Sequence, residues 1–205
     1  MLKVGLTGGY ASGKSFVARE LERLGCHLIY ADELGHAVLL PGGEAYAPTV
    51  QAFGAGILSA DGTIDRKKLA GTVFGSPELL DKLSGFVHPA VFRLEKQLLD
   101  GFEAQDPRGI AVIEAAILIE TGRYTAFDRL ILTACDETTQ IARGIKRDHL
   151  TREEVLARLQ KQMPLDEKKK YAHYIVNTSG PKEQTIHQVE CIYAELKCFA
   201  EAGQR

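Results

Sequence analysis

The chain has 205 residues, of which 45% are apolar and 25% are charged, and its formal net charge is −2. This length and composition suit one globular domain with a sizeable core. The charge argues against a basic surface for nucleic acid, so we expect no nucleic-acid partner. No apolar run approaches the ~18 residues of a membrane span, and glycines interrupt the N-terminal run, unlike in a signal peptide. We therefore expect a cytoplasmic protein with no membrane partner.

The four cysteines, Cys26, Cys135, Cys191 and Cys198, include no Cys-x-x-Cys pair and no zinc-like spacing. Each lies among apolar residues, which favours buried, reduced thiols. This cysteine usage also agrees with a cytoplasmic protein.

The start of the chain predicts a strand, a tight loop and a helix. The apolar run 2–6 ends in Thr7-Gly8-Gly9, which is typical of a buried strand that enters a loop. From residue 14 to 24 the apolar residues recur at helical spacing, and Gly25 follows as a helix stop. A second strand is predicted over 27–30.

The stretch from residue 32 to about 105 contains no convincing strand. Its pattern predicts a helical lobe inserted between strands and broken by turns at Pro41-Gly42-Gly43, Asp61-Gly62, Ser76-Pro77 and His88-Pro89. The rest of the chain returns to an alternation of strands and helices. Strands are predicted over 110–113, 129–134 and 174–176, and helices over 138–147, 152–162 and 182–199.

This alternation predicts an α/β fold with a parallel sheet of about five strands, covered by helices on both faces. The lysine run 168–170 is the one charge block, and it is expected on a solvated helix face. No feature of the sequence points to a particular oligomeric state.

The segment Gly8-Gly9-Tyr10-Ala11-Ser12-Gly13-Lys14-Ser15 matches G-x-x-x-x-G-K-[ST] in full. Glycines let such a loop curl so that several backbone N–H groups point at a polyphosphate. The helix that follows directs its positive end at the same anion. Lys14 is expected to reach the β- and γ-phosphates, and the Ser15 hydroxyl to hold Mg²⁺. This motif predicts a nucleoside triphosphate site, but not the class of enzyme.

Asp32 ends the strand that follows this helix. Ligands of open parallel sheets lie at the carboxyl ends of strands, so its carboxylate could orient or deprotonate a substrate hydroxyl, or hold Mg²⁺ through water. The alternative is a helix N-cap, because a helical pattern begins directly after it. The two roles are compatible, and the sequence favours neither.

A regulatory GTPase is a second class to weigh, because Asp32-Glu33-Leu34-Gly35 spells D-x-x-G. The guanine-reading Asn-Lys-x-Asp element should then follow a late strand, and residues 177–180 read Asn-Thr-Ser-Gly instead. We therefore favour an enzyme over a switch. Another small-molecule kinase, acting on nucleosides or nucleotides, is the third hypothesis.

Several motifs together resemble the dephospho-CoA kinase family over roughly residues 3–180. They are Gly5-Leu6-Thr7-Gly8-Gly9 with the phosphate loop, Ala31-Asp32, Pro41-Gly42-Gly43, Asp61 to Arg66, His88-Pro89, Ile117 to Glu120, Phe127-Asp128, and Gln140, Arg143 and Arg147 in a Q-x-x-R-x-x-x-R pattern, with Arg158, Gln162 and Asn177 after them. The phosphate loop occurs in many enzymes, whereas the combination of the other motifs is far more specific.

The resemblance implies a P-loop kinase domain, residues 1–205, that uses Mg²⁺ with ATP to phosphorylate the ribose 3′-hydroxyl of dephospho-CoA. It implies an acceptor-binding lobe over 32–105 and a lid over 138–172. Catalysis is assigned to Asp32, Lys14 and Arg147, Mg²⁺ binding to Ser15, and acceptor binding to Asp32, Arg66 and His88. ATP binding is assigned to Gly9, Tyr10, Ala11, Ser12, Gly13, Lys14, Ser15, Phe16, Arg143 and Asn177.

Other interpretations of these residues stay open at this point. Arg143 and Arg147 share a helix face that could simply be solvated. His88 could lie in a plain turn or be a buried structural imidazole, and Arg66 could pair with Asp61 or Asp65. The chain also departs from the family pattern at Tyr30, His36, Phe16 and His173, and none of these positions is one of the assigned catalytic residues.

Overall fold

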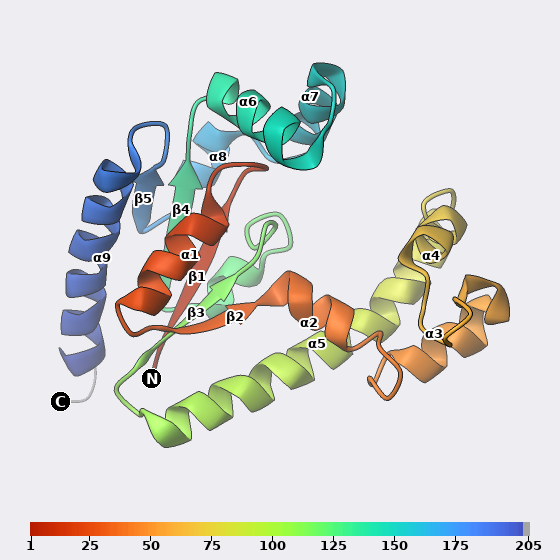
Figure 1. The fold of residues 1–205 in the computed structure, drawn as a ribbon. Helices are drawn as coiled ribbons and strands as arrows, with labels where there is room; N and C mark the ends of the chain where they lie inside the picture. The colour runs from red at the N-terminus through yellow and green to blue at the C-terminus, as the bar shows by residue number, and fades with distance from the viewer. Residues whose placement is uncertain (203–205) are drawn as a thin grey trace. The chain divides into compact units, whose positions relative to one another are not determined.

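The computed structural model describes residues 1–202 (Figure 1). The chain divides into two compact units, which we call the sheet unit, Met1–Ile29 with the chain from Gly101 onward, and the helical unit, Tyr30–Asp100. Among the described residues, no helix combines the length and the apolarity needed to cross a bilayer.

The sheet has five strands in the order β2-β3-β1-β4-β5. They are β1 (Leu2–Gly8), β2 (His27–Tyr30), β3 (Ile110–Glu114), β4 (Arg129–Ala134) and β5 (Tyr174–Asn177). The central strand β1 pairs in parallel with β3, from Leu2 opposite Ile110, and with β4, up to Gly8 opposite Thr133. The prediction of a five-stranded parallel α/β sheet is confirmed.

The apolar runs of these strands explain why they form the core. Val4, Leu6 and Ile131 are fully buried, as expected where helices cover both faces of a parallel sheet. Helices α1 (Lys14–Arg23) and α9 (Lys182–Ala202) pack together and both contact β1 and β3, as Figure 1 shows. A short helix, α8 (Leu165–Lys169), contacts β4.

Helices α6 (Glu137–Asp148) and α7 (Arg152–Gln160) follow the carboxyl end of β4. Asp136 caps α6 by accepting a hydrogen bond from the Thr139 N–H at 2.7 Å. Thr151 and Glu154 form a capping box at the start of α7. These side chains fix both helix starts beside the loop that follows β1.

The helical unit contains α2 (Ala31–Ala37), α3 (Tyr46–Phe53), the 3₁₀ turn η1 (Ala55–Ile57), α4 (Arg66–Val73) and most of α5 (Pro77–Gln105); a second 3₁₀ turn, η2 (Arg123–Ala126), lies in the sheet unit. The small buried core of the helical unit is formed by Ile57, Ile64, Leu69 and Val73. An isolated bridge pairs Leu58 with Ile64. The expectation of a strandless helical segment agrees with these elements.

The predicted turn at His88-Pro89 is wrong, because both residues lie inside α5. A proline within a helix removes one backbone hydrogen bond and costs about 3 kcal/mol. Ala90, Val91 and Glu95 are buried on this helix, so packing outweighs that cost. The local signal of His88-Pro89 therefore predicted a helix break that the tertiary packing of α5 prevents.

The lysine run does not lie wholly on a solvated face. Lys168 is 1% exposed, and its ammonium nitrogen lies 2.7 Å from the Glu120 carboxylate. Lys169 and Lys170 are exposed and pair with Asp166 and Glu167 on their own helix. Because α8 packs on β4, one of three consecutive lysines must point inward.

The prediction that all four cysteines are buried is correct for two of them. Cys26 and Cys135 are buried, and all four thiols are free. Burial raises the pKa of the Cys26 thiol to about 12 and also raises the pKa of Cys135. Cys191 and Cys198 are exposed on α9, because only one face of this helix covers the sheet.

Candidate active site

The loop between β1 and α1 has the conformation that its glycines allow. Gly13 has φ 87°, and Ala11 has φ 54°, a left-handed conformation that few non-glycine residues adopt. A Cβ atom at Gly8 would lie 2.1 Å from the Thr133 hydroxyl oxygen and 2.7 Å from the Thr133 carbonyl oxygen. Only glycine fits at that position, since β4 lies directly against the loop.

Two buried threonines anchor this loop to the sheet. The Ser12 and Thr133 hydroxyl oxygens are 2.7 Å apart, and the Thr178 hydroxyl donates to the Ser12 carbonyl at 2.8 Å. Thr133 is 0% exposed and Thr178 is 3% exposed. Sequence reasoning missed both residues. Thr133 lies one residue before the end of β4, and Thr178 directly follows β5, so both lie at the carboxyl ends of strands, where ligands of parallel sheets bind.

Lys14 lies over the loop. Its ammonium group donates to the Gly8 and Gly9 carbonyl oxygens, each at 3.1 Å, and the side chain is half-buried. This position places a cation at the concave side of the loop. Ser15 follows in the first turn of α1 and is exposed.

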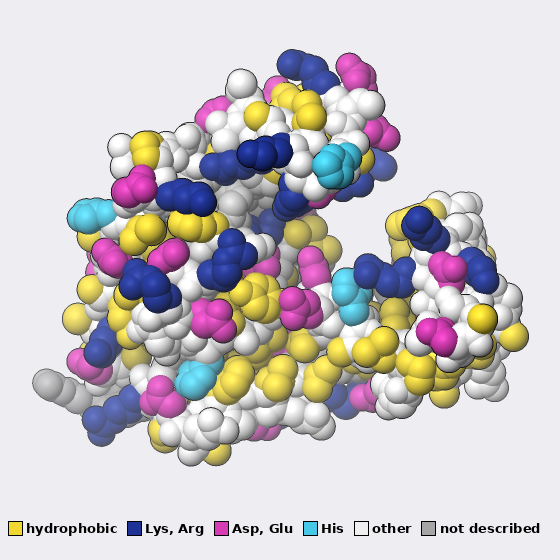
Figure 2. All heavy atoms as spheres, in the orientation of Figure 1, with side chains coloured by type: hydrophobic (Ala, Val, Ile, Leu, Met, Phe, Trp, Pro, Cys, Tyr) yellow, Lys and Arg dark blue, Asp and Glu magenta, His cyan; other side chains and the backbone are white. Residues whose placement is uncertain are grey.

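A cavity of 680 Å³ opens in front of the loop. Figure 2 shows Lys and Arg side chains gathered over α1 and α6 of the sheet unit, on the same part of the surface. This volume and basic lining suit a polyphosphate ligand. The cavity is lined by Ala11, Ser12, Gly13, Lys14, Ser15, Phe16, Arg19, Arg143, Lys146 and Arg147.

Arg143 joins α6 to the end of the sheet. Its guanidinium donates to the Thr178 hydroxyl at 3.1 Å and to the Thr178 carbonyl at 2.6 Å. These bonds exclude the solvated-face interpretation for Arg143, because they hold the group against the loop that follows β5. Arg19, Lys146 and Thr178 are further cavity residues that the sequence analysis did not name.

A smaller cavity of 230 Å³ shares Gly13, Phe16, Arg19 and Arg143 with the first one. Lys182 also lines this cavity, and its ammonium lies over the Phe16 ring, 5.7 Å from the ring centroid. An aromatic ring beside a guanidinium forms a surface on which a planar base can stack.

Asn177 is not among the residues that line the 680 Å³ cavity or the 230 Å³ cavity. Its side-chain oxygen accepts a hydrogen bond from the Ser179 N–H at 2.9 Å, and its backbone is bound by Gln188. The structure therefore shows Asn177 shaping the turn 177–180, whose members Thr178 and Gly180 line the smaller cavity.

Arg147 lies at the end of α6 and pairs with its neighbour Asp148. Nε donates to Oδ1 at 2.7 Å and Nη2 donates to Oδ2 at 2.9 Å. The Tyr10 hydroxyl also donates to Oδ2. Bonds from Arg147 and then Tyr10 hold the pKa of Asp148 well below its usual range. Burial, then the bond to Asp148, raises the pKa of Tyr10.

The Tyr10 backbone is bound by two glutamines of the expected lid region. The Tyr10 N–H donates to the Gln162 side-chain oxygen, and the Gln140 amide nitrogen donates to the Tyr10 carbonyl, both at 2.7 Å. Gln140 lies on α6, and Gln162 follows α7. Tyr10 therefore connects the phosphate loop to both helices.

The other three candidate residues, Asp32, Arg66 and His88, belong to the helical unit. Asp32 is exposed in the first turn of α2, and Tyr30 occupies the N-cap position of that helix. The N-cap interpretation of Asp32 is therefore wrong, because α2 begins one residue before Asp32.

Arg66 is the exposed first residue of α4, and Asp65 caps that helix through the N–H groups of Lys67 and Lys68. His88 is exposed in the middle of α5, and its ring stacks on Phe92 at 6.2 Å. Both structural interpretations of His88, a turn residue and a buried imidazole, are wrong.

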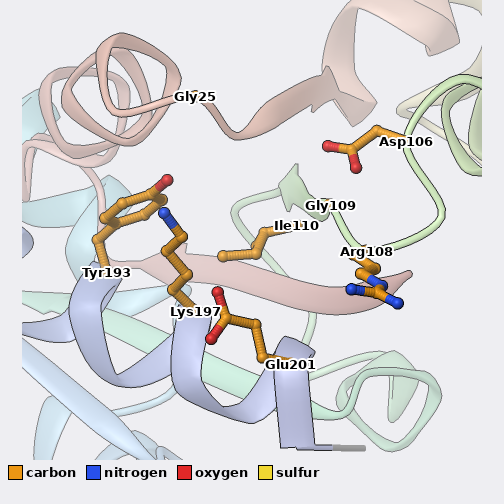
Figure 3. Close-up of a pocket in the computed structure, with 8 residues that line it drawn as sticks. All are labelled: Gly25, Asp106, Arg108, Gly109, Ile110, Tyr193, Lys197 and Glu201. Carbon is orange, nitrogen blue, oxygen red and sulfur yellow. The ribbon is translucent and has the colours of Figure 1, made fainter. Parts of the chain in front are cut away.

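Another hollow lies at the opposite ends of the strands (Figure 3). It has a volume of 570 Å³ and is bordered by Gly109 and Ile110, where β3 begins. The side chains of Tyr193, Lys197 and Glu201 project into it from α9. Ligands of open α/β sheets bind at the carboxyl ends of strands, so the cavity at the phosphate loop is the stronger candidate.

Solved structures share this fold. A Thermus thermophilus protein has a TM-score of 0.80 and 32% identity, covering 95% of this chain and 97% of that chain. Shikimate kinase from Acinetobacter baumannii has a TM-score of 0.51 at 15% identity, covering 100% and 96%, a likeness of fold alone. The five-stranded parallel sheet and the phosphate loop define the chain as a P-loop nucleotide-binding protein.

The family model described as dephospho-CoA kinase matches residues 2–184. The dephospho-CoA kinase of Geobacter metallireducens is 42% identical over 195 residues, 95% of this chain and 96% of that relative. The relative from Aquifex aeolicus, with the same description, is 38% identical over 96% of this chain and 98% of its own. The chain belongs to the dephospho-CoA kinase family.

Proposed function

We propose that this chain transfers the γ-phosphoryl group of ATP to the 3′-hydroxyl of the ribose of dephospho-CoA, giving CoA and ADP. Family membership over nearly the whole chain supports this reaction. The observation that carries it is one cavity that joins the phosphate loop to Arg143 and Arg147. A triphosphate in this cavity meets backbone N–H groups, two lysines and three guanidinium groups.

The ATP site that we propose follows the loop from Gly9 to Phe16. Backbone N–H groups of the loop and the start of α1 bind the phosphates, since a helix N-terminus attracts anions. Lys14 exchanges the loop carbonyls for the β- and γ-phosphate oxygens. The smaller cavity receives the adenine, which stacks between Phe16 and Arg143, while Asn177 supports the turn behind it.

Mg²⁺ enters this proposal with the nucleotide. Among residues 1–202 there is no group of three or more His, Cys, Asp or Glu side chains that could hold a metal ion by itself. Mg²⁺ keeps several waters and is commonly bound through substrate phosphates and few protein ligands, so the exposed Ser15 hydroxyl fits it. When bound, the ion neutralises charge on the phosphate oxygens.

The acceptor side of the reaction is assigned to the helical unit. Residues 32–105 bind dephospho-CoA, with Arg66 and His88 as contacts, and Asp32 orients the ribose hydroxyl and accepts its proton. The region 138–172 acts as a lid that excludes water, because water would otherwise hydrolyse ATP. Phosphoryl transfer has a loose transition state, so positioning and charge stabilisation contribute most, and Arg147 supplies part of that charge.

An acceptor panel tests this function. The protein is incubated with Mg²⁺ and ATP and with dephospho-CoA, adenosine or a nucleoside monophosphate, and kcat/KM is measured for each acceptor. Among these acceptors, we expect efficient turnover only of dephospho-CoA. Comparable turnover of a nucleoside or a nucleotide would contradict the proposal and favour another small-molecule kinase. A preference for GTP without need of an acceptor would favour a switch protein.

A further inference from the structure

Asp148 has a position that the established chemistry of a phosphate loop does not explain. Its carboxylate takes two hydrogen bonds from Arg147 in the parallel arrangement that a guanidinium and a carboxylate favour. Arg158 of α7 lies 3.7 Å from the same carboxylate. The side chain of Asp148 is 25% exposed, so solvent screens these contacts only in part.

Tyr10 connects this carboxylate to the phosphate loop. Its hydroxyl donates to Asp148, and the guanidinium groups of Arg147 and Arg158 lie 5.2 and 5.4 Å from its ring centroid. The ring also packs closely on α6, since a Cβ atom at Gly144 would lie 2.8 Å from Tyr10 Cε1. Four contacts, with Asp148, Arg147, Gly144 and Arg158, therefore fix the side chain of Tyr10 against α6 and α7.

We propose that Asp148 is a positioning residue, which together with Tyr10 holds the Arg147 guanidinium in the orientation needed for phosphoryl transfer. This inference rests on the proposed function. The pair with Asp148 uses Nε and Nη2 and leaves Nη1 of Arg147 outside it, and Arg147 lines the phosphate-loop cavity. Asp148 thus acts through Arg147 and not on the substrate.

The chemistry of the pair explains why a carboxylate serves here. A long arginine side chain has several rotatable bonds, and ordering it costs entropy during the reaction unless a neighbour orders it beforehand. A carboxylate fixes the plane of the guanidinium with two bonds, which an amide cannot do because its nitrogen is a donor. Tyr10 then sets the distance between this fixed plane and the loop that binds the phosphates.

Asp148→Asn, Arg147→Ala and the double variant test the proposal. For Asp148→Asn we expect kcat to fall about 10- to 100-fold, as for a misplaced catalytic group, while KM for ATP changes less than about threefold. In the Arg147→Ala background the same substitution should change kcat by less than about twofold, because groups that act as one unit are not additive. Tyr10→Phe, which keeps the ring, should reproduce part of the loss.

Glu190→Gln is the matched control. Glu190 is an exposed carboxylate of α9 that pairs with Arg23 at 3.0 Å, and its removal should leave kcat unchanged. Circular dichroism and the Tm of each variant report folding, and ATP binding is measured separately by calorimetry.

Two results would overturn the inference. One is normal kcat in Asp148→Asn, and the other is an undiminished loss when the substitution is added to Arg147→Ala. If the wild-type protein makes CoA, either of these results contradicts only the positioning role of Asp148. Wild-type protein that folds and binds ATP but makes no CoA contradicts the proposed function itself.

Discussion

Lys14 shows how single residues prepare the site. Its ammonium group is bound by the carbonyl oxygens of Gly8 and Gly9, so the cation already lies at the concave side of the loop. These two hydrogen bonds hold the side chain against the loop instead of leaving it in solvent. In the ATP site that we propose, Lys14 exchanges these two carbonyl oxygens for phosphate oxygens.

The first prediction concerns Lys14→Ala. The variant should lose ~10²-fold or more in kcat, because it lacks a charge that stabilises the moving phosphoryl group. Its Tm should fall slightly, since two loop carbonyls lose their donor. Arg23→Ala is the control, because that side chain is 53% exposed on α1 and pairs only with surface carboxylates, Glu20 and Glu190, in the contacts the structure gives. Turnover of Lys14→Ala within a few-fold of the control would refute the assignment.

The second prediction compares Asp32 with its neighbour Glu33. Both are exposed in the first turn of α2, so Asp32→Asn and Glu33→Gln each remove one charge from the same helix end. Asp32→Asn should lower kcat by roughly 10²–10⁴-fold, as for a lost general base, while Glu33→Gln stays near wild type. Thermal melts of both should agree closely. Equal kcat values in the two variants would argue against a catalytic Asp32.

The sequence predicts residues whose neighbours are local and misses those whose partners are remote. Lys14 and Ser15 follow from one short motif. Thr133 and Thr178 meet Ser12 across more than a hundred residues, so no local pattern reveals them. His173, a departure from the family pattern, accepts a hydrogen bond from the Leu130 N–H through Nδ1, so it has a structural contact at the sheet.

At the scale of elements, α6 combines two demands on one helix. Arg143 and Arg147 are four residues apart and reach the same cavity, as their helical spacing predicts. Gly144 lies between them and leaves room for Tyr10 and for Val155 of α7. The contact between the phosphate loop, α6 and α7 therefore depends on a glycine at position 144, which has no side chain.

The third prediction concerns Gly144→Ala. Alanine in an open helical position is stabilising by roughly 0.5–1 kcal/mol relative to glycine. Here its Cβ would lie 2.8 Å from Tyr10 Cε1 and 2.9 Å from Val155 Cγ2, so we expect a lower Tm and lower kcat. Gly101→Ala on α5, where nothing lies within 4 Å, should instead raise the Tm. A stabilised, fully active Gly144→Ala would show that the contact is not needed.

The fourth prediction concerns the start of α6. Bonds from the Thr139 N–H and hydroxyl lower the pKa of Asp136 from 3.8 to about 2. Because the folded-state pKa is depressed, the charged cap stabilises the protein above about pH 4, and this stability is lost as the pH falls toward 2. Asp136→Asn keeps a cap but has no titration. The Tm difference between the two proteins should shrink over that window, and a constant difference would contradict the assignment.

The elements themselves follow from the sequence with few errors. All five strands were predicted within two residues of their observed ends, because continuous apolar runs mark buried parallel strands. The errors lie where tertiary packing decides. Pro89 stays inside α5 because its neighbours are buried, and Lys168 turns inward because α8 packs on β4. Neither outcome follows from local pattern.

At the scale of the whole molecule, the chain separates its tasks. The sheet unit contains the phosphate loop, the 680 Å³ and 230 Å³ cavities beside it, and the arginines of α6. The helical unit contains Asp32, Arg66 and His88, the residues that we assign to the acceptor. Under the proposed function the two substrates bind to different units, and we expect the catalytic set to be complete only when both are bound, which limits ATP hydrolysis.

The most direct test follows the γ-phosphoryl group itself. Wild-type protein is incubated with Mg²⁺, γ-labelled ATP and dephospho-CoA, and the label is traced by chromatography and by phosphorus NMR of the product. Our account predicts that the label appears in CoA, on the ribose 3′-oxygen, with little in inorganic phosphate. Label found mainly in inorganic phosphate, or at another position of the acceptor, would contradict it.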